Sequence, residues 1–334
     1  MGAAVAIAPE RQFGNDVLTL DAAAESERII AALRRQVVAD LGRRGAVLGL
    51  SGGIDSSVVA ALCVRAFGRE KVLGIFMPER HSSDDSLRLG RRCAEQIGIA
   101  TVLEDISPAL DGLGSYQRQI EAIQTVVPEY DERWKCKLVL PPVSASHGLN
   151  ITRLTVQGPE GTRTVRLPSD AYLQIVAATN YKQRIRKMTE YYHADRLRYA
   201  VVGTPNRLEH DQGFFVKQGD GVADVMPIAH LYKTQVYQLA EYLQVDEEIR
   251  RRPPTTDTFS LPQSQEEFYF SLPYRLMDLC LYAVNHGVAP DVVAGVIGMQ
   301  TDQVVMVFRD IRAKRRSSRY LHARPAHLSE VNGE

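Results

Sequence analysis

The strongest constraint on the fold of this chain is a run of small residues that joins an apolar strand to a helix. The run reads Leu48-Gly49-Leu50-Ser51-Gly52-Gly53-Ile54-Asp55-Ser56-Ser57. A turn of this kind exposes successive backbone N–H groups, and the following helix adds the partial positive charge of its amino end. Its three serine hydroxyls are further hydrogen-bond donors, and Asp55 supplies a carboxylate of the kind that binds magnesium. The segment therefore predicts a phosphate-binding loop.

The apolar pattern around this loop predicts alternating helices and strands. In chain order we expect helix Asp21–Leu41, strand Ala46–Leu50, helix Ser56–Phe67, strand Val72–Met77, helix Ser83–Ile97 and strand Ala100–Leu103. Near-continuous apolar strands that alternate with helices are typical of a parallel, doubly wound α/β sheet. Ligands of such Rossmann-like sheets bind beyond the carboxyl ends of the strands, which is where the glycine turn lies.

The pattern changes over residues 110–168, which we interpret as a β-rich inserted segment. Ile151–Val156 and Thr162–Leu167 flank a turn with two glycines, and they predict a β-hairpin. Alternation then resumes, and we expect a single domain over residues 1–334 that ends in a tail at 320–334. The later elements that we expect are helix Ala171–His193, strand Arg198–Gly203, and helices Thr234–Leu243, Glu247–Arg251, Tyr274–His286, Val292–Val296 and Asp302–Ala313.

Charge and cysteine content exclude several classes of function. The 40 basic and 40 acidic residues cancel, which argues against a protein that binds nucleic acid through bulk positive charge. The four cysteines lack C-x-x-C spacing, so neither a zinc site nor a disulfide framework is expected. No apolar run approaches the roughly 20 residues that a membrane span needs, and we expect no secretory signal, because the first residues lack the basic-then-apolar order of one. A cytoplasmic protein fits these features.

The loop differs from a Walker A motif, because an aspartate follows its glycines where a lysine and Ser/Thr would stand. Ser-Gly-Gly-x-Asp-Ser after a strand resembles the pyrophosphate-binding loop of the N-type ATP pyrophosphatases, of the adenine nucleotide alpha hydrolase type. That resemblance implies cleavage of ATP between its α and β phosphates and activation of a carboxyl or related group by adenylation.

A second cluster of motifs resembles the NAD synthase family. It comprises Gly203-Thr204-Pro205-Asn206-Arg207-Leu208-Glu209, then Gly213 to Asp224, which contains Lys217-Gln218-Gly219-Asp220-Gly221, then Leu231-Tyr232-Lys233-Thr234. Together with the glycine loop, the similarity runs from Asp21 to about Pro325 outside the inserted segment. Several motifs in the family's order are more specific than one glycine loop.

The resemblance implies ATP-dependent amidation by a carbon–nitrogen ligase. In this family the carboxylate of nicotinic acid adenine dinucleotide (deamido-NAD) attacks the α-phosphate of ATP, and ammonia then displaces AMP to give NAD. A carboxylate needs such a leaving group, and the charged phosphates need cations, magnesium and lysine, to stabilise the transition state.

The family match implies a role for each matching residue of this sequence. Asp55 and Glu209 would bind Mg²⁺, and the catalytic residues would be Asp220, which receives ammonia, with Lys217 and Lys233. ATP would be bound by Leu50, Ser51, Gly52, Gly53, Asp55, Ser56, Ser57, Thr204, Lys233 and Thr255. Deamido-NAD would be bound by Arg184, Lys217, Asp224 and Lys314, the last with Arg315 as a basic pair.

Some positions depart from the family pattern next to the implied acid site. Val216 replaces a threonine, Gln218 a tyrosine and Val222 a glycine, while Ala313 replaces a histidine. Adenylation is therefore better supported than the identity of the acid. An ammonia-dependent amide synthetase that acts on another carboxylate, such as a sugar uronate or a biosynthetic acid, is the alternative. A tRNA-modifying or sulfur-transferring enzyme would need catalytic cysteines or net basic charge, and a catalytically dead nucleotide sensor would not need Asp55, Glu209 and Lys233.

The nitrogen source and the oligomeric state are further expectations. About 45 residues precede the glycine loop, too few for a fused glutaminase domain of nitrilase type. We therefore expect free ammonia, or ammonia delivered by a separate glutaminase. The resemblance also implies a homodimer, and we expect neither nucleic acid nor membrane as a partner.

Overall fold

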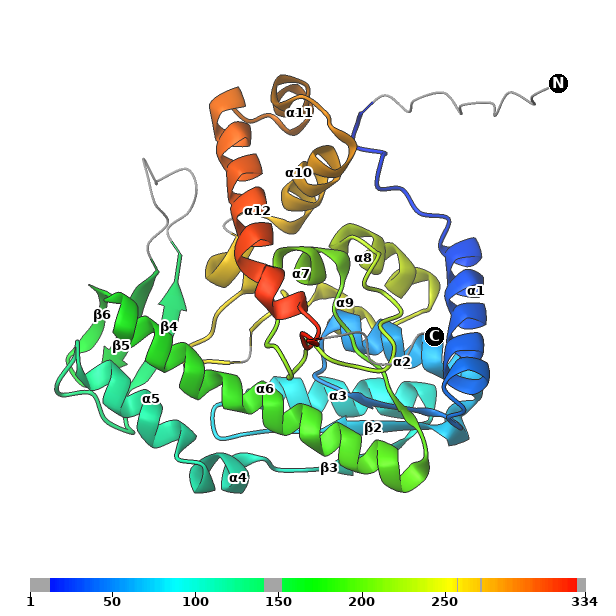
Figure 1. The fold of residues 1–334 in the computed structure, drawn as a ribbon, viewed down its shortest axis with the longest axis horizontal. Coiled ribbons are helices and arrows are strands. Elements are labelled where there is room, and N and C mark those ends of the chain that lie inside the picture. The colour runs from blue at the N-terminus through cyan, green and yellow to red at the C-terminus, as the bar shows by residue number, and fades with distance from the viewer. Residues whose placement is uncertain (1–12, 141–151, 257, 271, 329–334) are drawn as a thin grey trace.

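A four-stranded parallel sheet forms the centre of the computed structural model, which describes residues 13–140, 152–256, 258–270 and 272–328 (Figure 1). The strand order is β3-β2-β1-β7. The sequence prediction of an α/β fold with a parallel sheet is confirmed. The strands are β1 (Ala46–Gly49), β2 (Val72–Phe76), β3 (Ala100–Leu103) and β7 (Ala200–Val201).

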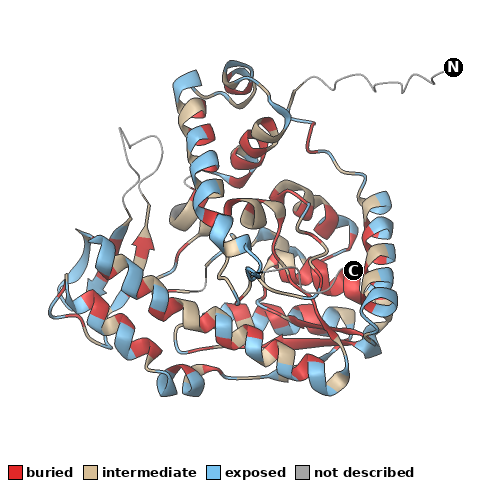
Figure 2. Cartoon of the chain, in the orientation of Figure 1, coloured by how far each residue is buried: buried red, intermediate tan, exposed pale blue. Residues whose placement is uncertain are grey.

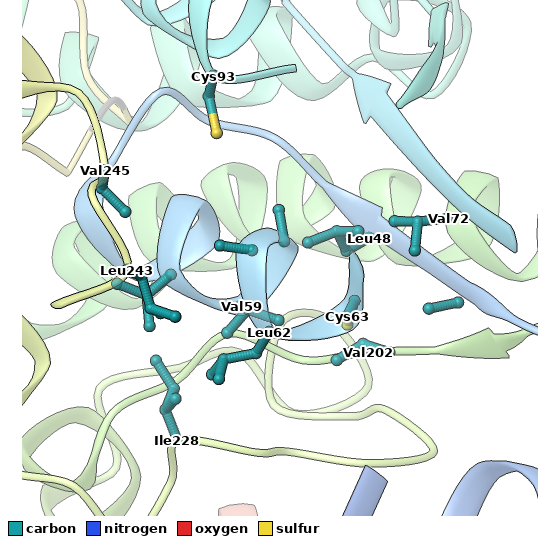
Figure 3. Close-up of a cluster of buried hydrophobic side chains, with 14 of the residues drawn as sticks. Leu48, Val59, Leu62, Cys63, Val72, Cys93, Val202, Ile228, Leu243 and Val245 are labelled. Atoms are coloured by element: carbon teal, nitrogen blue, oxygen red, sulfur yellow. The ribbon is translucent and has the colours of Figure 1, made fainter. Parts of the chain in front are cut away.

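Helices cover both faces of this sheet because side chains alternate along each strand. In β1, Ala46 and Leu48 belong to one core, whereas Val47 faces a second core with residues of the long helix α6. Figure 3 shows the first core, in which Leu48 lies near Val59 and Leu62 of the helix after the loop. The covering elements are α1 (Ala22–Leu33) with its π-helical continuation (Arg34–Asp40), α2 (Ile54–Phe67), a 3₁₀ turn (Arg69–Lys71), α3 (Asp84–Ile97), α6 (Ser169–Leu197) and α8 (Lys233–Tyr242).

The strand expected at Arg198–Gly203 is shorter than predicted. Helix α6 ends at Arg198 in a left-handed conformation, with φ of +57°, and only Ala200 and Val201 pair with β1. Val202 then forms a single bridge to Val225. The N–H of Val202 still donates to the carbonyl of Val47 in β1 (2.9 Å), whereas the N–H of Gly203 donates to the carbonyl of Val225 (2.8 Å), so the chain leaves the sheet after Val202.

A small antiparallel sheet comes after the first three strands of the main sheet in the sequence (Figure 1). Its strands are β4 (Lys135–Val139), β5 (Arg153–Gly158) and β6 (Gly161–Arg166), in the order β4-β5-β6. The predicted hairpin is confirmed, because Gly158 pairs with Gly161 across the turn; Ile151 lies outside the described residues. Two preceding helices were not predicted, α4 (Ser107–Gly112) and α5 (Ser115–Gln124). The buried face of α5 includes the polar residues Ser115 and Gln119.

The last third of the chain is helical, as predicted, and has its own core. The predicted helices α10 (Tyr274–His286), α11 (Pro290–Ile297) and α12 (Thr301–His322) pack in this core, together with α7 (Arg207–Gln212) and a π-helical turn (Glu266–Phe270), which were not predicted. The predicted helix α9 (Glu247–Arg251) instead packs on the core of the main sheet through Ile249. Helix α12 continues nine residues beyond the predicted end at Ala313. Residues 320–322 are therefore helical and do not belong to the expected tail.

Burial follows these layers, with buried residues concentrated on the sheet and the inner faces of the helices (Figure 2). All four cysteines are buried free thiols. Within the described ranges, no single helix is long and apolar enough to cross a membrane. Helices α11 and α12 together pass the same length and composition test, but they meet at an angle of 113°.

Candidate active site

The glycine loop connects β1 to α2 at the carboxyl edge of the sheet. Gly53 is the N-cap of α2, and its carbonyl accepts hydrogen bonds from the hydroxyls of Ser56 (3.0 Å) and Ser57 (2.9 Å). Gly52 has φ of +70°, and a Cβ there would lie 2.5 Å from the carbonyl oxygen of Ser86. Only glycine fits this position without strain, because the backbone of α3 approaches it so closely.

A cavity of about 840 Å³ opens beside this loop. Ten of the residues that the sequence predicted to bind or react line it: Leu50, Ser51, Gly53, Asp55, Ser56, Thr204, Glu209, Asp220, Thr255 and Lys314. They come from the loop, from the end of β7, from α7 and from the C-terminal half of the chain. The fold therefore brings the two motif clusters together around one cavity.

Two largely buried carboxylates, of Asp55 and Glu209, and a fully buried lysine form a cluster at the amino end of α2. Lys233 Nζ forms an ion pair with Asp55, and the lysine side chain is fully buried. Asn206, also fully buried, donates from its amide to Asp55 Oδ1 (3.2 Å) and caps α7 by accepting from the N–H of Glu209. Burial and the charge of Asp55 raise the pKa of Glu209 to about 7.

This cluster fits a divalent cation that also binds phosphate oxygens. Mg²⁺ is typically held by one or two carboxylates together with substrate phosphates and water. Asp55 and Glu209 both line the cavity, and Asn206 donates a hydrogen bond to each of the two carboxylates, which holds them on the same side of it. In the described part of the chain, no group of three or more His, Cys, Asp or Glu side chains is arranged to hold a metal without such oxygens.

Asp278 of α10 fixes the position of Lys233, and sequence analysis did not identify it. Its carboxylate accepts hydrogen bonds from the N–H of Lys233 (3.3 Å) and from the N–H (2.7 Å) and hydroxyl (2.6 Å) of Thr234. Burial raises the pKa of Asp278 to about 6. The carboxylate thus caps α8 and connects the helical region to the cluster around Asp55. No sequence motif indicated this contact, because Asp278 lies on a helix 45 residues later.

Asp220 lies in the cavity wall beside charged residues of α6. Its Oδ1 accepts a hydrogen bond from the N–H of Val216 (2.7 Å), and burial raises its pKa. Arg186, Lys187 and Glu190 line the same cavity and were not predicted. They follow the basic motif that contains Arg184 in the sequence. The sequence does not show that they face the cavity, because this depends on how α6 is rotated against β1.

Lys314 is held inside the cavity wall by α12. Its Nζ forms an ion pair with Asp310 (2.7 Å) and donates to the carbonyl of Tyr269 (2.7 Å), and burial lowers its pKa. Arg315, the second member of the basic pair, instead binds Asp211 and Asn285. The continuous helix therefore turns the two neighbouring side chains in different directions.

Six predicted residues do not line the cavity: Gly52, Ser57, Arg184, Lys217, Asp224 and Lys233. Gly52 and Ser57 are next to lining residues in the glycine loop, and Lys233 pairs with the lining residue Asp55. Lys217 donates to the carbonyls of Tyr320 (2.7 Å) and Ala323 (3.1 Å), and Arg184 donates to the carbonyl of Lys217 (3.3 Å). Asp224 accepts from the N–H of Val201 (2.8 Å).

Two further groups at the cavity were not predicted. Arg252 lines it and donates to the hydroxyls of Ser83 (3.3 Å) and Ser86 (3.0 Å) near the glycine loop. Lys182 forms a buried ion pair with Glu79 (2.8 Å) and donates to the carbonyl of Thr258 (2.8 Å), which lines the cavity. Both contacts join segments that are far apart in the sequence.

A parallel α/β sheet with a glycine turn, a helix amino end and an acidic pair at its carboxyl edge defines an α/β nucleotide-binding protein. The sequence model of the NAD synthase family matches residues 25–132 and 148–320. The chain belongs to the NAD synthase family. Of the segment that we interpreted as an insertion, only residues 133–147 interrupt this match.

Curated relatives match nearly the whole chain. An NH(3)-dependent NAD(+) synthetase of Mesorhizobium japonicum is 73% identical over 316 residues, which cover 94% of this chain and 99% of that protein. A protein of the same name from Rhizobium meliloti is 58% identical and covers 96% of each chain. A solved NH3-dependent NAD synthetase of Campylobacter jejuni aligns with a TM-score of 0.60 at 21% identity, over 93% of this chain and all of that one, which supports the fold.

Proposed function

We propose that the chain is an ammonia-dependent NAD⁺ synthetase, a carbon–nitrogen ligase that amidates deamido-NAD at the expense of ATP. The observation that carries this proposal is the similarity to the Mesorhizobium japonicum protein, 73% over nearly all of both chains. The cavity supports it, because it combines a phosphate-binding turn with buried carboxylates and a lysine. A reducing, cytoplasmic location fits the free thiols.

In this proposal ATP is bound with its phosphates at the glycine turn. Backbone N–H groups of the turn and the amino end of α2 face the anion, and the hydroxyls of Ser51 and Ser56 line the same wall. Thr204 contacts the nucleotide from the end of the neighbouring strand β7, and Thr255 from the segment after α9. Lys233 lies behind Asp55 and stabilises negative charge there, since its ammonium is fully desolvated.

Asp55 and Glu209 would hold Mg²⁺ at the phosphates. The bound metal would neutralise phosphate charge and favour loss of pyrophosphate. Asn206 orients both carboxylates through its side-chain and backbone hydrogen bonds. The acid of the substrate attacks the α-phosphate, pyrophosphate leaves, and an acyl-adenylate remains in the cavity.

Asp220 is the residue that we propose to bind ammonium and to accept its proton. A buried carboxylate attracts the cation and accepts its proton, which leaves ammonia as the nucleophile in a site that excludes bulk water. Its raised pKa favours this proton transfer. Ammonia then attacks the acyl carbon and AMP leaves.

The proposed deamido-NAD residues divide between the cavity and the outer surface. Lys314 lines the cavity, whereas Arg184 is exposed and contacts the backbone of Lys217. We propose that the dinucleotide extends from the cavity toward this surface and that a second copy of the chain completes the site there, in a homodimer. The ammonia is free, or a separate glutaminase delivers it.

The test uses the purified chain with deamido-NAD, ATP, MgCl₂ and ammonium chloride. NAD, AMP and pyrophosphate should form in equal amounts, and glutamine should not replace ammonium. A panel of other acids, including sugar uronates, tests the alternative acid substrate. If a different acid supports pyrophosphate release and deamido-NAD does not, the proposed substrate is wrong, although the adenylation chemistry would stand.

A further inference from the structure

A second pair of buried charges lies in the cavity wall, on the long helix α6. Lys187 Nζ and Glu190 Oε2 are 2.6 Å apart, and each side chain is less than a tenth exposed. Both residues line the cavity together with Asp220. The family resemblance assigned no role to either residue.

A buried ion pair of this kind is weak evidence for a role in stability. Burying two charges costs desolvation energy, and well-packed apolar residues of similar volume are often equally stable or more stable. The backbone beside Glu190 also leaves room for its carboxylate, at Gly49. The last residue of β1 is Gly49, and a Cβ there would lie 3.0 Å from Glu190 Oε1. The absence of that Cβ leaves room for the carboxylate at the start of the glycine loop.

The positive charge of Lys187 acts on both Glu190 and Asp220. Burial raises the pKa of both carboxyl groups, each of which the charge of Lys187 stabilises in its ionised form. The negative charge of Asp220 raises the pKa of Glu190 further. Two proton acceptors thus lie around one lysine, in the wall of the cavity where ammonia is expected to react.

The amidation releases two protons when it starts from ammonium. Ammonium gives one proton to become ammonia; its nitrogen then forms a bond to the acyl carbon, and the bond from that carbon to the AMP oxygen breaks with its electron pair. The attached nitrogen must lose a second proton to become an amide. Asp220 can accept only one of the two.

We propose that Glu190, held in place by Lys187, accepts the second proton and is a further catalytic residue of the amidation step. This inference rests on the proposed function. It predicts different effects on the two half-reactions, adenylation and amidation. Adenylation forms the acyl-adenylate before ammonia reacts, so it does not require Glu190. Amidation requires it.

The experiment compares Glu190→Gln and the double variant Lys187→Met with Glu190→Leu against the wild-type chain. Exchange of labelled pyrophosphate into ATP, with deamido-NAD and without ammonium, measures adenylation. Formation of NAD with ammonium measures amidation. We expect exchange within about twofold of wild type and amidation reduced by about 100-fold, as general acid–base residues contribute factors of this order.

Glu104→Gln is the matched control, because Glu104 also contacts α6, through His193 (2.7 Å), but does not line the cavity. It should leave both rates within about twofold of wild type. Amidation that persists in the apolar double variant would overturn the inference, as would an equal loss of exchange and amidation in both variants. A wild-type chain that shows no exchange would instead overturn the proposed function, and the inference with it.

Discussion

We call the region around Asp55, Glu209 and Lys233 the proposed phosphate side of the candidate site, and the region around Arg184 and Lys217 its proposed dinucleotide side. The two sides differ in which groups balance their charges. Around Asp55, Glu209 and Lys233, opposite charges are buried against one another and fixed by Asn206 and Asp278. Around Arg184 and Lys217, the cationic groups bind backbone carbonyls of the same chain at the surface. The first region is complete within one chain, whereas the second has cationic groups that a ligand or a second subunit could engage instead.

The largest effect should come from removing the one lysine of the buried cluster. Lys233→Met leaves Asp55 and Glu209 without their shared cation, and charge that develops on the phosphates loses its desolvated partner. We expect adenylation, measured by pyrophosphate exchange, to fall by about 10³-fold. Lys135→Met, at an exposed lysine of β4, is the control. Exchange within tenfold of wild type would show that the two regions do not differ as described.

The glycine turn should show the next effect, this time on stability. Gly52→Ala forces an L-residue to φ of +70° and places its Cβ 2.5 Å from the carbonyl oxygen of Ser86. We expect a loss of about 2 to 4 kcal/mol in the free energy of unfolding, because strain and steric overlap add. Urea denaturation measures it. Gly42→Ala is the contrasting variant: its φ of +60° is similar, but no heavy atom lies within 4 Å of its Cβ position, so it should lose less stability than Gly52→Ala.

The buried carboxylates predict a particular pH dependence. Glu209 has an ordinary pKa of 4.5 that burial and Asp55 raise to about 7 in the folded chain. The folded state therefore binds more protons than the unfolded state between these values, and stability falls as pH rises from about 4.5 to 7. In Glu209→Gln this loss should be smaller. Urea denaturation at pH 5 and pH 7, without magnesium, measures it; an equal pH dependence in both proteins would contradict the assignment.

Local sequence signals predicted which segments meet at the glycine loop, while the phosphate-binding roles of their residues stay predictions. The turn from Ser51 to Ser57 and the motif around Glu209 are continuous in the sequence, and the parallel sheet brings their ends to one edge. Asp278 and Glu190 could not be found in this way, because their roles depend on helix rotation and on contacts across the chain. Helix α5 was missed because its buried face is partly polar.

The dinucleotide side remains a prediction for Arg184, Lys217 and Asp224. Their motif matches the family, but the described chain satisfies these side chains with its own groups. The single-domain organisation and the inserted segment at 110–168 also remain predictions. The motif identifies these residues in the sequence, but it does not show whether they face the cavity, which depends on the fold.

The smallest effect, and the sharpest test of the surface region, is expected for Lys217→Ala. It removes two exposed hydrogen bonds to the carbonyls at the end of α12, which should cost less than about 1 kcal/mol of stability. If Lys217 leaves these carbonyls to bind deamido-NAD, the KM for deamido-NAD should rise about tenfold, the equivalent of one charged hydrogen bond. The KM for ATP should stay unchanged, because Lys217 does not line the cavity. Equal changes in both KM values would place Lys217 on the phosphate side and remove the distinction between the two regions.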